Sequence, residues 1–175
     1  MAKRYVFDTN VFIQAKNREY RFDFCLPFWR WIESGHKHQL FYSSKKVLDE
    51  LRANDPKRKC PARQWADQMP APFFMEDARD AEAMKHYSTL MRWAYNSTQY
   101  LMAAKKEFAR DANADAFIVA VARQHGLTIV THETPKPAAK STVPMHSAAK
   151  VLGVETIQLY DLLSLHANPN FVFKP

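Results

Sequence analysis

Val6-Phe7-Asp8-Thr9-Asn10 is the stretch that decides the fold of this chain. It completes a short apolar run that begins at Tyr5. Because no polar residue alternates with the apolar ones, the run predicts a strand buried on both faces. Thr9 and Asn10 are residue types that start helices. An acid between an inner strand and a helix lies where open α/β sheets bind their ligands. Asp8 is therefore either the cap of the next helix or part of a functional site.

The rest of the chain alternates predicted strands and helices, which favours an α/β fold with a parallel sheet and right-handed crossovers. An aromatic-rich helix is expected to end at Ser34-Gly35. Ser43 or Ser44 should cap a helix over 45–51. A break at 96–98 should divide the helical region 76–110. A buried helix closed by Gly126 leads into a strand ending at Thr131. The remaining predicted elements are a helix over 9–15, strands over 39–42 and 154–159, and helices over 144–152 and 161–166.

The composition fits one soluble domain. A chain of 175 residues buries roughly 70% of its unfolded surface and needs no disulfide to fold. Apolar residues make up 47% and charged residues 25% of the sequence, as in globular proteins. There are only three glycines, so no glycine-rich phosphate loop is present. Cys25 and Cys60 form no CxxC motif, which favours two free thiols in a reducing cytosol.

Charge and hydropathy indicate a cytoplasmic protein with a polyanionic partner. No signal peptide is recognisable at the N-terminus. The longest apolar run, 116–122, is too short to cross a bilayer. The net charge of +7 and the pI of about 9.4 point towards nucleic acid.

Basic residues gather in two polar loops. Lys57-Arg58-Lys59 and Arg63 lie in a break that contains proline and are either solvated or contact phosphates. Lys136 and Lys140 lie in a later loop. The aromatic residues of the second helix are expected in the core or against a partner. The histidines have no metal-ligand spacing, and we expect His132 at the surface.

Four acids occupy the ends of predicted elements: Asp8, Glu50, Asp115 and Glu133. In a parallel sheet these ends share one edge. Two carboxylates about 4 Å apart repel by about 4 kcal/mol at an effective dielectric constant near 20. A fold keeps such a cluster when a divalent cation neutralises it, and oxygen ligands favour Mg²⁺ or Mn²⁺ over zinc.

The chain resembles the PIN-domain ribonucleases over most of its length. The resemblance rests on four motifs that occur in the family's order: Val6-Phe7-Asp8-Thr9-Asn10, Val47-Leu48-Asp49-Glu50-Leu51, Ala114-Asp115-Ala116-Phe117-Ile118-Val119-Ala120 and Ile129-Val130-Thr131-His132-Glu133. It implies a three-layer α/β/α fold with a central, mostly parallel sheet. Residues 1–175 would then form a single PIN-like nuclease domain with a pocket for Mg²⁺ or Mn²⁺.

The resemblance also assigns roles to residues. By position, Asp8, Glu50 and Asp115 match the family's usual metal-binding acids. Glu133 stands where the family usually has Asp, so one-metal and two-metal sites both remain open. Asp111 is expected to cap the following helix, although it could substitute as the fourth acid. The polar residues that match the family's supporting positions are Thr9, Asn10 and Thr131.

The implied function is a metal-dependent endoribonuclease that leaves 5′-phosphate and 3′-hydroxyl ends. The chain looks most like an uncharacterised PIN-like branch, many of whose relatives are toxins of toxin–antitoxin pairs. The expected partners are therefore RNA, an antitoxin protein and a second copy of the chain, with the aromatic helix as a candidate dimer surface. Asp8 and Asp115 would hold the cation, while Glu50 and Glu133 would bind it through water or act as base. The residues expected to hold the RNA backbone are Lys57, Arg58, Lys59, Lys136 and Lys140.

Two other functions remain open at this point. A PIN-like module could bind RNA or protein without cutting, although retention of all four acids argues against it. A structure-specific DNA nuclease of the flap-endonuclease type would need a helical arch and a duplex-binding motif, and we identify neither. Metal titration and a comparison of RNA with DNA substrates distinguish these alternatives.

Overall fold

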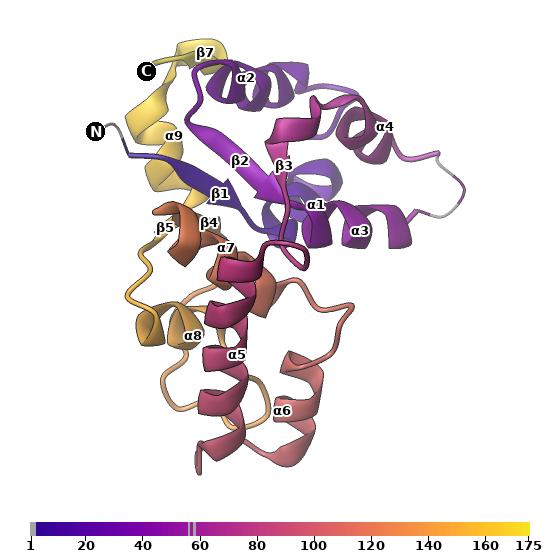
Figure 1. The fold of residues 1–175 in the computed structure, drawn as a ribbon. Coiled ribbons are helices and arrows are strands. Elements are labelled where there is room, and N and C mark those ends of the chain that lie inside the picture. Colours follow the sequence, from indigo (N-terminus) through magenta and orange to yellow (C-terminus); the bar gives the residue numbers. More distant parts are fainter. Residues whose placement is uncertain (1–2, 56, 58) are drawn as a thin grey trace.

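The structure is a computed structural model that describes residues 3–55, 57 and 59–175, and a parallel sheet forms its centre (Figure 1). The sheet strands are β1 (Tyr5–Phe7), β2 (Phe41–Ser44), β3 (Phe74–Met75), β4 (Thr128–Thr131) and β5 (Thr156–Gln158). The α-helices described are α1 (Thr9–Asn17), α2 (Leu26–Lys37), α3 (Lys45–Ala53), α4 (Pro61–Gln68), α5 (Ala81–Asn96), α6 (Met102–Phe108), α7 (Asp115–His125), α8 (Met145–Val151) and α9 (Leu159–His166). Short 3₁₀ turns, η1 (Ala71–Phe73) and η2 (Pro169–Phe171), and the strands β6 (Ala167–Asn168) and β7 (Val172–Phe173) complete the described elements.

The strand order is β3-β2-β1-β4-β5, and every pair in this sheet is parallel. β1 lies at the centre, where Val6 faces Tyr42 on one side and Ile129 on the other. The expected parallel sheet is therefore confirmed. Because the strands are parallel, the carboxyl ends of β1, β2 and β4 lie at one edge, and Asp8 follows β1 there. The antiparallel pair β6–β7 is separate from this sheet.

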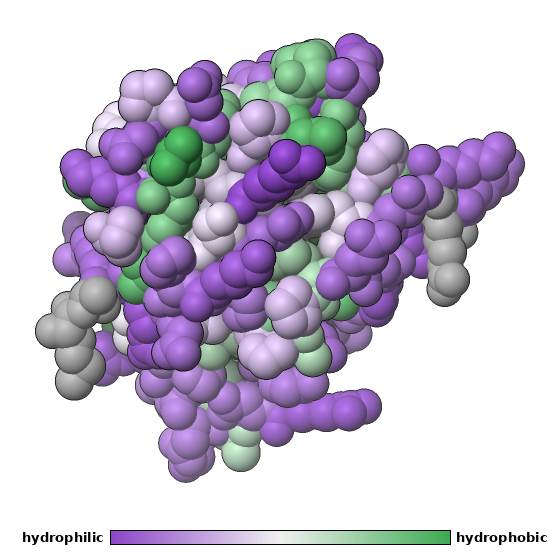
Figure 2. Space-filling model, turned by 90° about the horizontal axis from the view of Figure 1, so that it is seen from above, coloured by the Kyte–Doolittle hydropathy of each residue, from purple (hydrophilic) through white to green (hydrophobic). Residues whose placement is uncertain are grey.

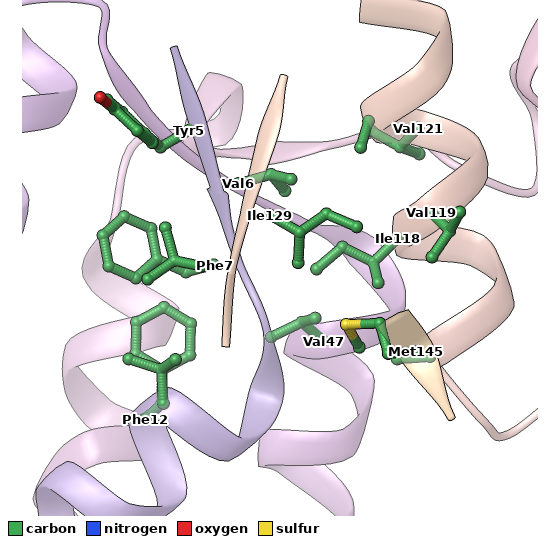
Figure 3. Packing of buried hydrophobic residues seen from close by; sticks show 14 of the residues in the cluster. Tyr5, Val6, Phe7, Phe12, Val47, Ile118, Val119, Val121, Ile129 and Met145 are labelled. Atoms are coloured by element: carbon green, nitrogen blue, oxygen red, sulfur yellow. The ribbon is translucent and has the colours of Figure 1, made fainter. Parts of the chain in front are cut away.

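Helices cover both faces of the sheet and give the predicted three-layer α/β/α architecture. Phe7 and Phe12 lie on one side of β1, whereas Val6 and Ile129 face α7 on the other side (Figure 3). On the first side, α2 lies next to the end of α9, since the indole Nε1 of Trp31 donates to the His166 carbonyl at 2.8 Å. On the second side, α7 contacts both β4 and α8.

The aromatic residues of α2 belong to the core. Phe28, Trp29 and Trp31 are at most 1% exposed, and the Trp31 ring packs on Phe41 with centroids 4.8 Å apart. This contact excludes the buried rings from a dimer surface, so the prediction that the aromatic helix forms one is wrong for them. The core alternative is confirmed.

Gly35 lies inside α2, so the prediction that the helix ends at Ser34-Gly35 is wrong. A Cβ at Gly35 would lie 2.0 Å from Cδ2 of Phe41, and the glycine therefore makes room for this ring. The second strand also begins and ends two residues later than predicted, at Phe41–Ser44. Ser43 can lie inside a buried strand because its hydroxyl donates to the Phe7 carbonyl at 2.8 Å.

We expect Gly35→Ala to lower the free energy of unfolding by about 2 kcal/mol. Alanine favours the helix by up to about 1 kcal/mol, but overpacking a core costs about 1–3 kcal/mol, and Phe41 is fully buried. Urea denaturation measures the change. Ser34→Ala, one residue earlier in α2, is the control and should have little effect. A Gly35→Ala chain as stable as the wild type would show that Phe41 moves freely.

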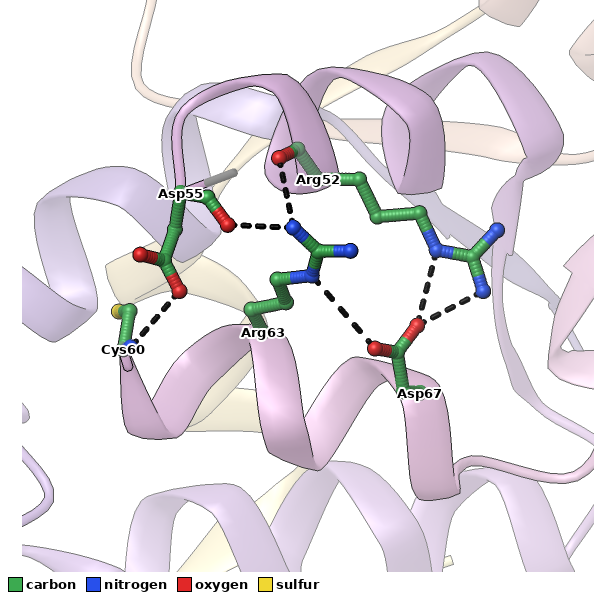
Figure 4. Close-up of polar contacts among 5 residues, drawn as sticks. All are labelled: Arg52, Asp55, Cys60, Arg63 and Asp67. Atoms are coloured by element: carbon green, nitrogen blue, oxygen red, sulfur yellow. Dashed lines mark hydrogen bonds and ion pairs between the residues drawn. The ribbon is translucent and has the colours of Figure 1, made fainter. Parts of the chain in front are cut away.

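The loop between α3 and α4 is tied to both helices through Arg63 (Figure 4). Arg63 is 8% exposed, and its Nη1 donates to the Arg52 carbonyl at 3.0 Å and to the Asp55 carbonyl. Its Nε lies 3.6 Å from Asp67, which also accepts from Arg52. Arg63 is therefore committed to this network, and the hypothesis that it contacts a phosphate is wrong.

Other boundaries follow the sequence closely. The helical region 76–110 divides into α5 and α6 around the predicted break, and both helices extend away from the sheet (Figure 1). Gly126 adopts the left-handed conformation expected of a C-cap, with φ +63°.

Both cysteines are free. Among the described residues, no helix has the length and apolar character needed to span a bilayer.

The surface is largely hydrophilic on the face shown in Figure 2. The described chain also exposes some large apolar side chains, of which Phe24 and Tyr95 are 63% and 69% exposed. Leu26, at the start of α2, is 45% exposed.

Candidate active site

Asp8 lies at the carboxyl end of β1 and is only 1% exposed. Its backbone N–H continues the sheet ladder by donating to the Val130 carbonyl at 3.0 Å. The hydroxyl of Thr131, at the end of the neighbouring strand β4, donates to Asp8 Oδ2 at 3.1 Å. The two strand ends predicted to meet therefore do meet. Asp8 is also the N-cap residue of α1, but its side chain makes no capping hydrogen bond.

Glu50 joins the beginnings of two helices. Ser44 caps α3 through the Val47 N–H, as predicted for one of the two serines. One turn further along α3, the carboxylate of Glu50 accepts from the Thr9 hydroxyl in α1. Its other oxygen accepts from the backbone N–H of Ala114, immediately before α7, at 2.9 Å. Glu50 thus orients the segments that carry Asp8 and Asp115.

Asp115 and Glu133 line one pocket. Asp115 opens α7, and its backbone N–H donates to Asn113 Oδ1 at 2.8 Å. Glu133 follows β4, and its Oε2 accepts from the Met145 N–H at 3.2 Å. Both acids border a cavity of about 210 Å³ between α6 and the loop before α8. Lys136, Ser141 and Thr142 also line this cavity.

Asp8 and Asp115 are perturbed by burial and by the charges of the other acids. Burial raises the pKa of Asp8 from 3.8 to about 7; the hydrogen bond from Thr131 opposes this, and the charges of Glu133 and Glu50 add to it. The pKa of Asp115 is also well above its usual value. Desolvation is the largest cause there, followed by the charges of Asp8, Glu133 and Glu50. The structure therefore brings Asp8, Glu50, Asp115 and Glu133 together, as the parallel-sheet argument predicts.

The donor set suits a hard divalent cation. All candidate ligand atoms are carboxylate oxygens, which Mg²⁺ and Mn²⁺ prefer. Burial is the main cause of the raised pKa of Asp8 and Asp115, and a cation would relieve the repulsion that adds to it. Within the described part of the chain, no three His, Cys, Asp or Glu side chains already stand in a chelating arrangement. Glu50 and Glu133 instead direct oxygens to hydrogen-bond donors.

The supporting polar residues divide into two groups. Thr9 and Thr131 donate to Glu50 and Asp8, so both contact the acids. Asn10 is exposed in the first turn of α1.

The predicted RNA-binding lysines that the structure describes are all exposed: Lys57, Lys59, Lys136 and Lys140. Arg58 lies outside the described residues.

Asp111 and His132 differ from expectation. Asp111 does not cap α7, because it pairs with Lys46 at 2.9 Å while Asn113 binds the first helical N–H. His132 is half-buried rather than a surface residue. Its ring lies 5.8 Å from that of Tyr160, and burial lowers its pKa.

The sequence-based prediction missed one buried acid. Asp77 is 3% exposed and accepts from the N–H of Lys46 at 2.7 Å and of Ala78 at 2.6 Å. It holds the first turn of α3, the helix that carries Glu50. The sequence signals Asp77 only by its place shortly after the apolar pair Phe74-Met75.

Comparison with known proteins gives one family, and the similar solved structures include two of low identity. A family model described as "Domain of unknown function (DUF4411)" matches residues 5–168. The solved structure of FitAcB from Neisseria gonorrhoeae is 19% identical, covers 87% of this chain and 96% of its own, and has a TM-score of 0.48. That of FitAB bound to an IR36 DNA fragment is 17% identical, covers 98% of each chain, and has the same TM-score. No curated protein matches significantly.

Proposed function

The chain belongs to the DUF4411 family, and we propose that it is a PIN-like, metal-dependent endoribonuclease that hydrolyses RNA phosphodiester bonds. The observation that supports this proposal is the convergence of Asp8, Glu50, Asp115 and Glu133 at the carboxyl edge of a parallel sheet. Burial, and after it the charges of the neighbouring acids, raises the pKa of Asp8 and Asp115. Open α/β sheets bind ligands at this edge.

Asp8 and Asp115 are the proposed holders of Mg²⁺ or Mn²⁺. When bound, such a cation supplies a nucleophilic hydroxide near neutral pH and neutralises charge on the scissile phosphate. Asp8 lies deepest in the cluster, and Thr131 fixes one of its oxygens. Glu50 and Glu133 lie around this pair, where they would bind the cation through water or act as the base.

The exposed lysines would contact the RNA backbone. Lys136 lines the cavity that Asp115 and Glu133 also line, so one positively charged side chain lies next to these acids. Lys57, Lys59 and Lys140 are exposed and available for phosphates. The net charge of +7 favours association with a polyanion.

We extend the proposal to the biological setting through the resemblance to PIN-domain toxins. The chain would act in the cytoplasm as the toxin of a toxin–antitoxin pair. An antitoxin protein would restrain it, and it would form a homodimer. Co-expression with the protein encoded next to it tests the antitoxin role, because an antitoxin restores growth that the chain alone arrests.

Removal and return of the metal test the activity. We expect Mn²⁺ to support cleavage of single-stranded RNA, excess EDTA to stop it, and added Mn²⁺ to restore it. The cut ends should carry 5′-phosphate and 3′-hydroxyl groups. RNA that is bound but not cut would favour a binding module, and preferential cutting of branched DNA would favour a structure-specific DNA nuclease. Cleavage that continues in EDTA would contradict the metal dependence.

A further inference from the structure

We propose that His146 and Gln158 are positioning residues that hold Glu133, and through Thr131 also Asp8, in the arrangement needed for the cation. The inference rests on the proposed function. Neither residue belongs to the acid cluster or to its sequence motifs. His146 comes from α8 and Gln158 from the end of β5. His146 and Gln158 lie 13 and 25 positions from Glu133 in the sequence, so only the fold brings them to it.

The first part of the network connects Glu133 to Asp8. The backbone N–H of Glu133 donates to Thr131 Oγ1 at 3.0 Å. The same hydroxyl donates its proton to Asp8 Oδ2 at 3.1 Å. The position of the Glu133 main chain therefore determines how the Thr131 hydroxyl is directed at Asp8.

The second part fixes the other side of the Glu133 residue. Its carbonyl accepts from His146 Nε2 at 2.7 Å and from Gln158 Nε2 at 2.5 Å. Its carboxylate accepts from the Met145 N–H, so α8 contacts both the main chain and the side chain of Glu133. β4 ends at Thr131, and these bonds take the place of a strand ladder at Glu133.

Thr156 sets the orientation of the His146 ring. A carbonyl only accepts, so His146 Nε2 carries the hydrogen that binds Glu133. In the neutral imidazole, His146 Nδ1 then accepts from the Thr156 hydroxyl at 2.9 Å. Both ring nitrogens are thus used, and the ring is locked between β5 and Glu133. Partners of this kind typically change metal affinity about 10–100-fold when they are removed.

Mn²⁺ binding measured by isothermal titration calorimetry tests the inference without relying on catalysis. We expect His146→Ala to weaken Mn²⁺ binding about tenfold and Gln158→Ala to weaken it in the same direction. His146→Gln should restore most of the affinity, because its amide N–H can replace Nε2. In RNA cleavage, kcat should fall while KM stays near the wild-type value.

His38→Ala is the matched control. His38 also binds a main-chain carbonyl, that of Ser34 at 2.8 Å, but it lies just before β2 at the amino end of the sheet. It should bind Mn²⁺ like the wild type. Urea denaturation of the metal-free variants separates a loss of folding from a loss of positioning.

The outcomes separate the two proposals. Wild-type Mn²⁺ affinity in both His146→Ala and Gln158→Ala would overturn the positioning role and leave the nuclease proposal standing. A weakened His146→Ala that His146→Gln does not restore would also overturn it, because the carbonyl bond would then not be the cause. A wild-type chain that binds no Mn²⁺ would overturn the nuclease proposal and this inference together.

Discussion

Replacing Asp8 with Asn should reduce Mn²⁺-dependent RNA cleavage about 10³-fold, the factor that corresponds to a loss of ~4 kcal/mol of transition-state stabilisation. Asp8 is the most buried of the four acids and lies nearest the end of the central strand. Asparagine keeps the shape of the side chain and can still accept from the Thr131 hydroxyl. The substitution therefore removes the charge that would hold the cation and little else.

Single-turnover cleavage of a labelled RNA measures this effect. Asp49→Asn is the matched control, since Asp49 is an exposed carboxylate next to Glu50 on α3. It should cut RNA at nearly the wild-type rate. If Asp8→Asn cuts as fast as Asp49→Asn, Asp8 has no part in the reaction.

The titration of Asp8 should lower the stability of the metal-free protein as the pH rises from about 4 to about 7. The pKa of Asp8 is about 7 in the folded chain and 3.8 in the unfolded chain. Between these values the folded state binds more protons than the unfolded state, so the free energy of unfolding falls as the pH rises. The contribution of Asp8 is complete below pH 3.8 and is lost by about pH 7. The raised pKa of Asp115 acts in the same direction.

The comparison with Asp8→Asn isolates this contribution. The lowered pKa values of Asp67 and Asp80 oppose the trend at acidic pH, but they are common to both chains. The difference between 7 and 3.8 corresponds to ~4 kcal/mol. We therefore expect metal-free Asp8→Asn to be more stable than the wild type at pH 8 by about 2–4 kcal/mol, and nearly equal to it at pH 4. Urea denaturation in EDTA at the two pH values measures this, and a wild type that is more stable at pH 8 would contradict it.

The sequence predicts the acid cluster because its members follow local rules. Asp8 comes directly after an apolar strand, and Glu133 lies two residues after another. Asp115 is the first residue of an apolar helix. Parallel strands then bring these ends to one edge of the sheet. Ser44 and Gly126 were predictable for the same reason, since caps depend on a few neighbouring residues.

The predictions that fail depend on distant side chains. Gly35 has the pattern of a helix end, but the Phe41 ring explains its place inside α2. Asp111 and Asn113 are both suitable caps, and the choice between them follows from Lys46 on α3, which pairs with Asp111. The sequence pattern of Arg63 is that of an exposed basic residue in a loop. In the fold it instead contacts the Asp55 carbonyl and the Asp67 carboxylate. His146 and Gln158 carry no motif that points to Glu133.

Calorimetric titration of Mn²⁺ into the metal-free chain at pH 7.5 tests the central claim most directly, namely that the four acids form one cation site. We predict saturable binding to the wild type and to Asp49→Asn, and its loss in Asp8→Asn and Asp115→Asn. Equal Mn²⁺ binding by the wild type and these two variants, or no binding by the wild type, would contradict the account.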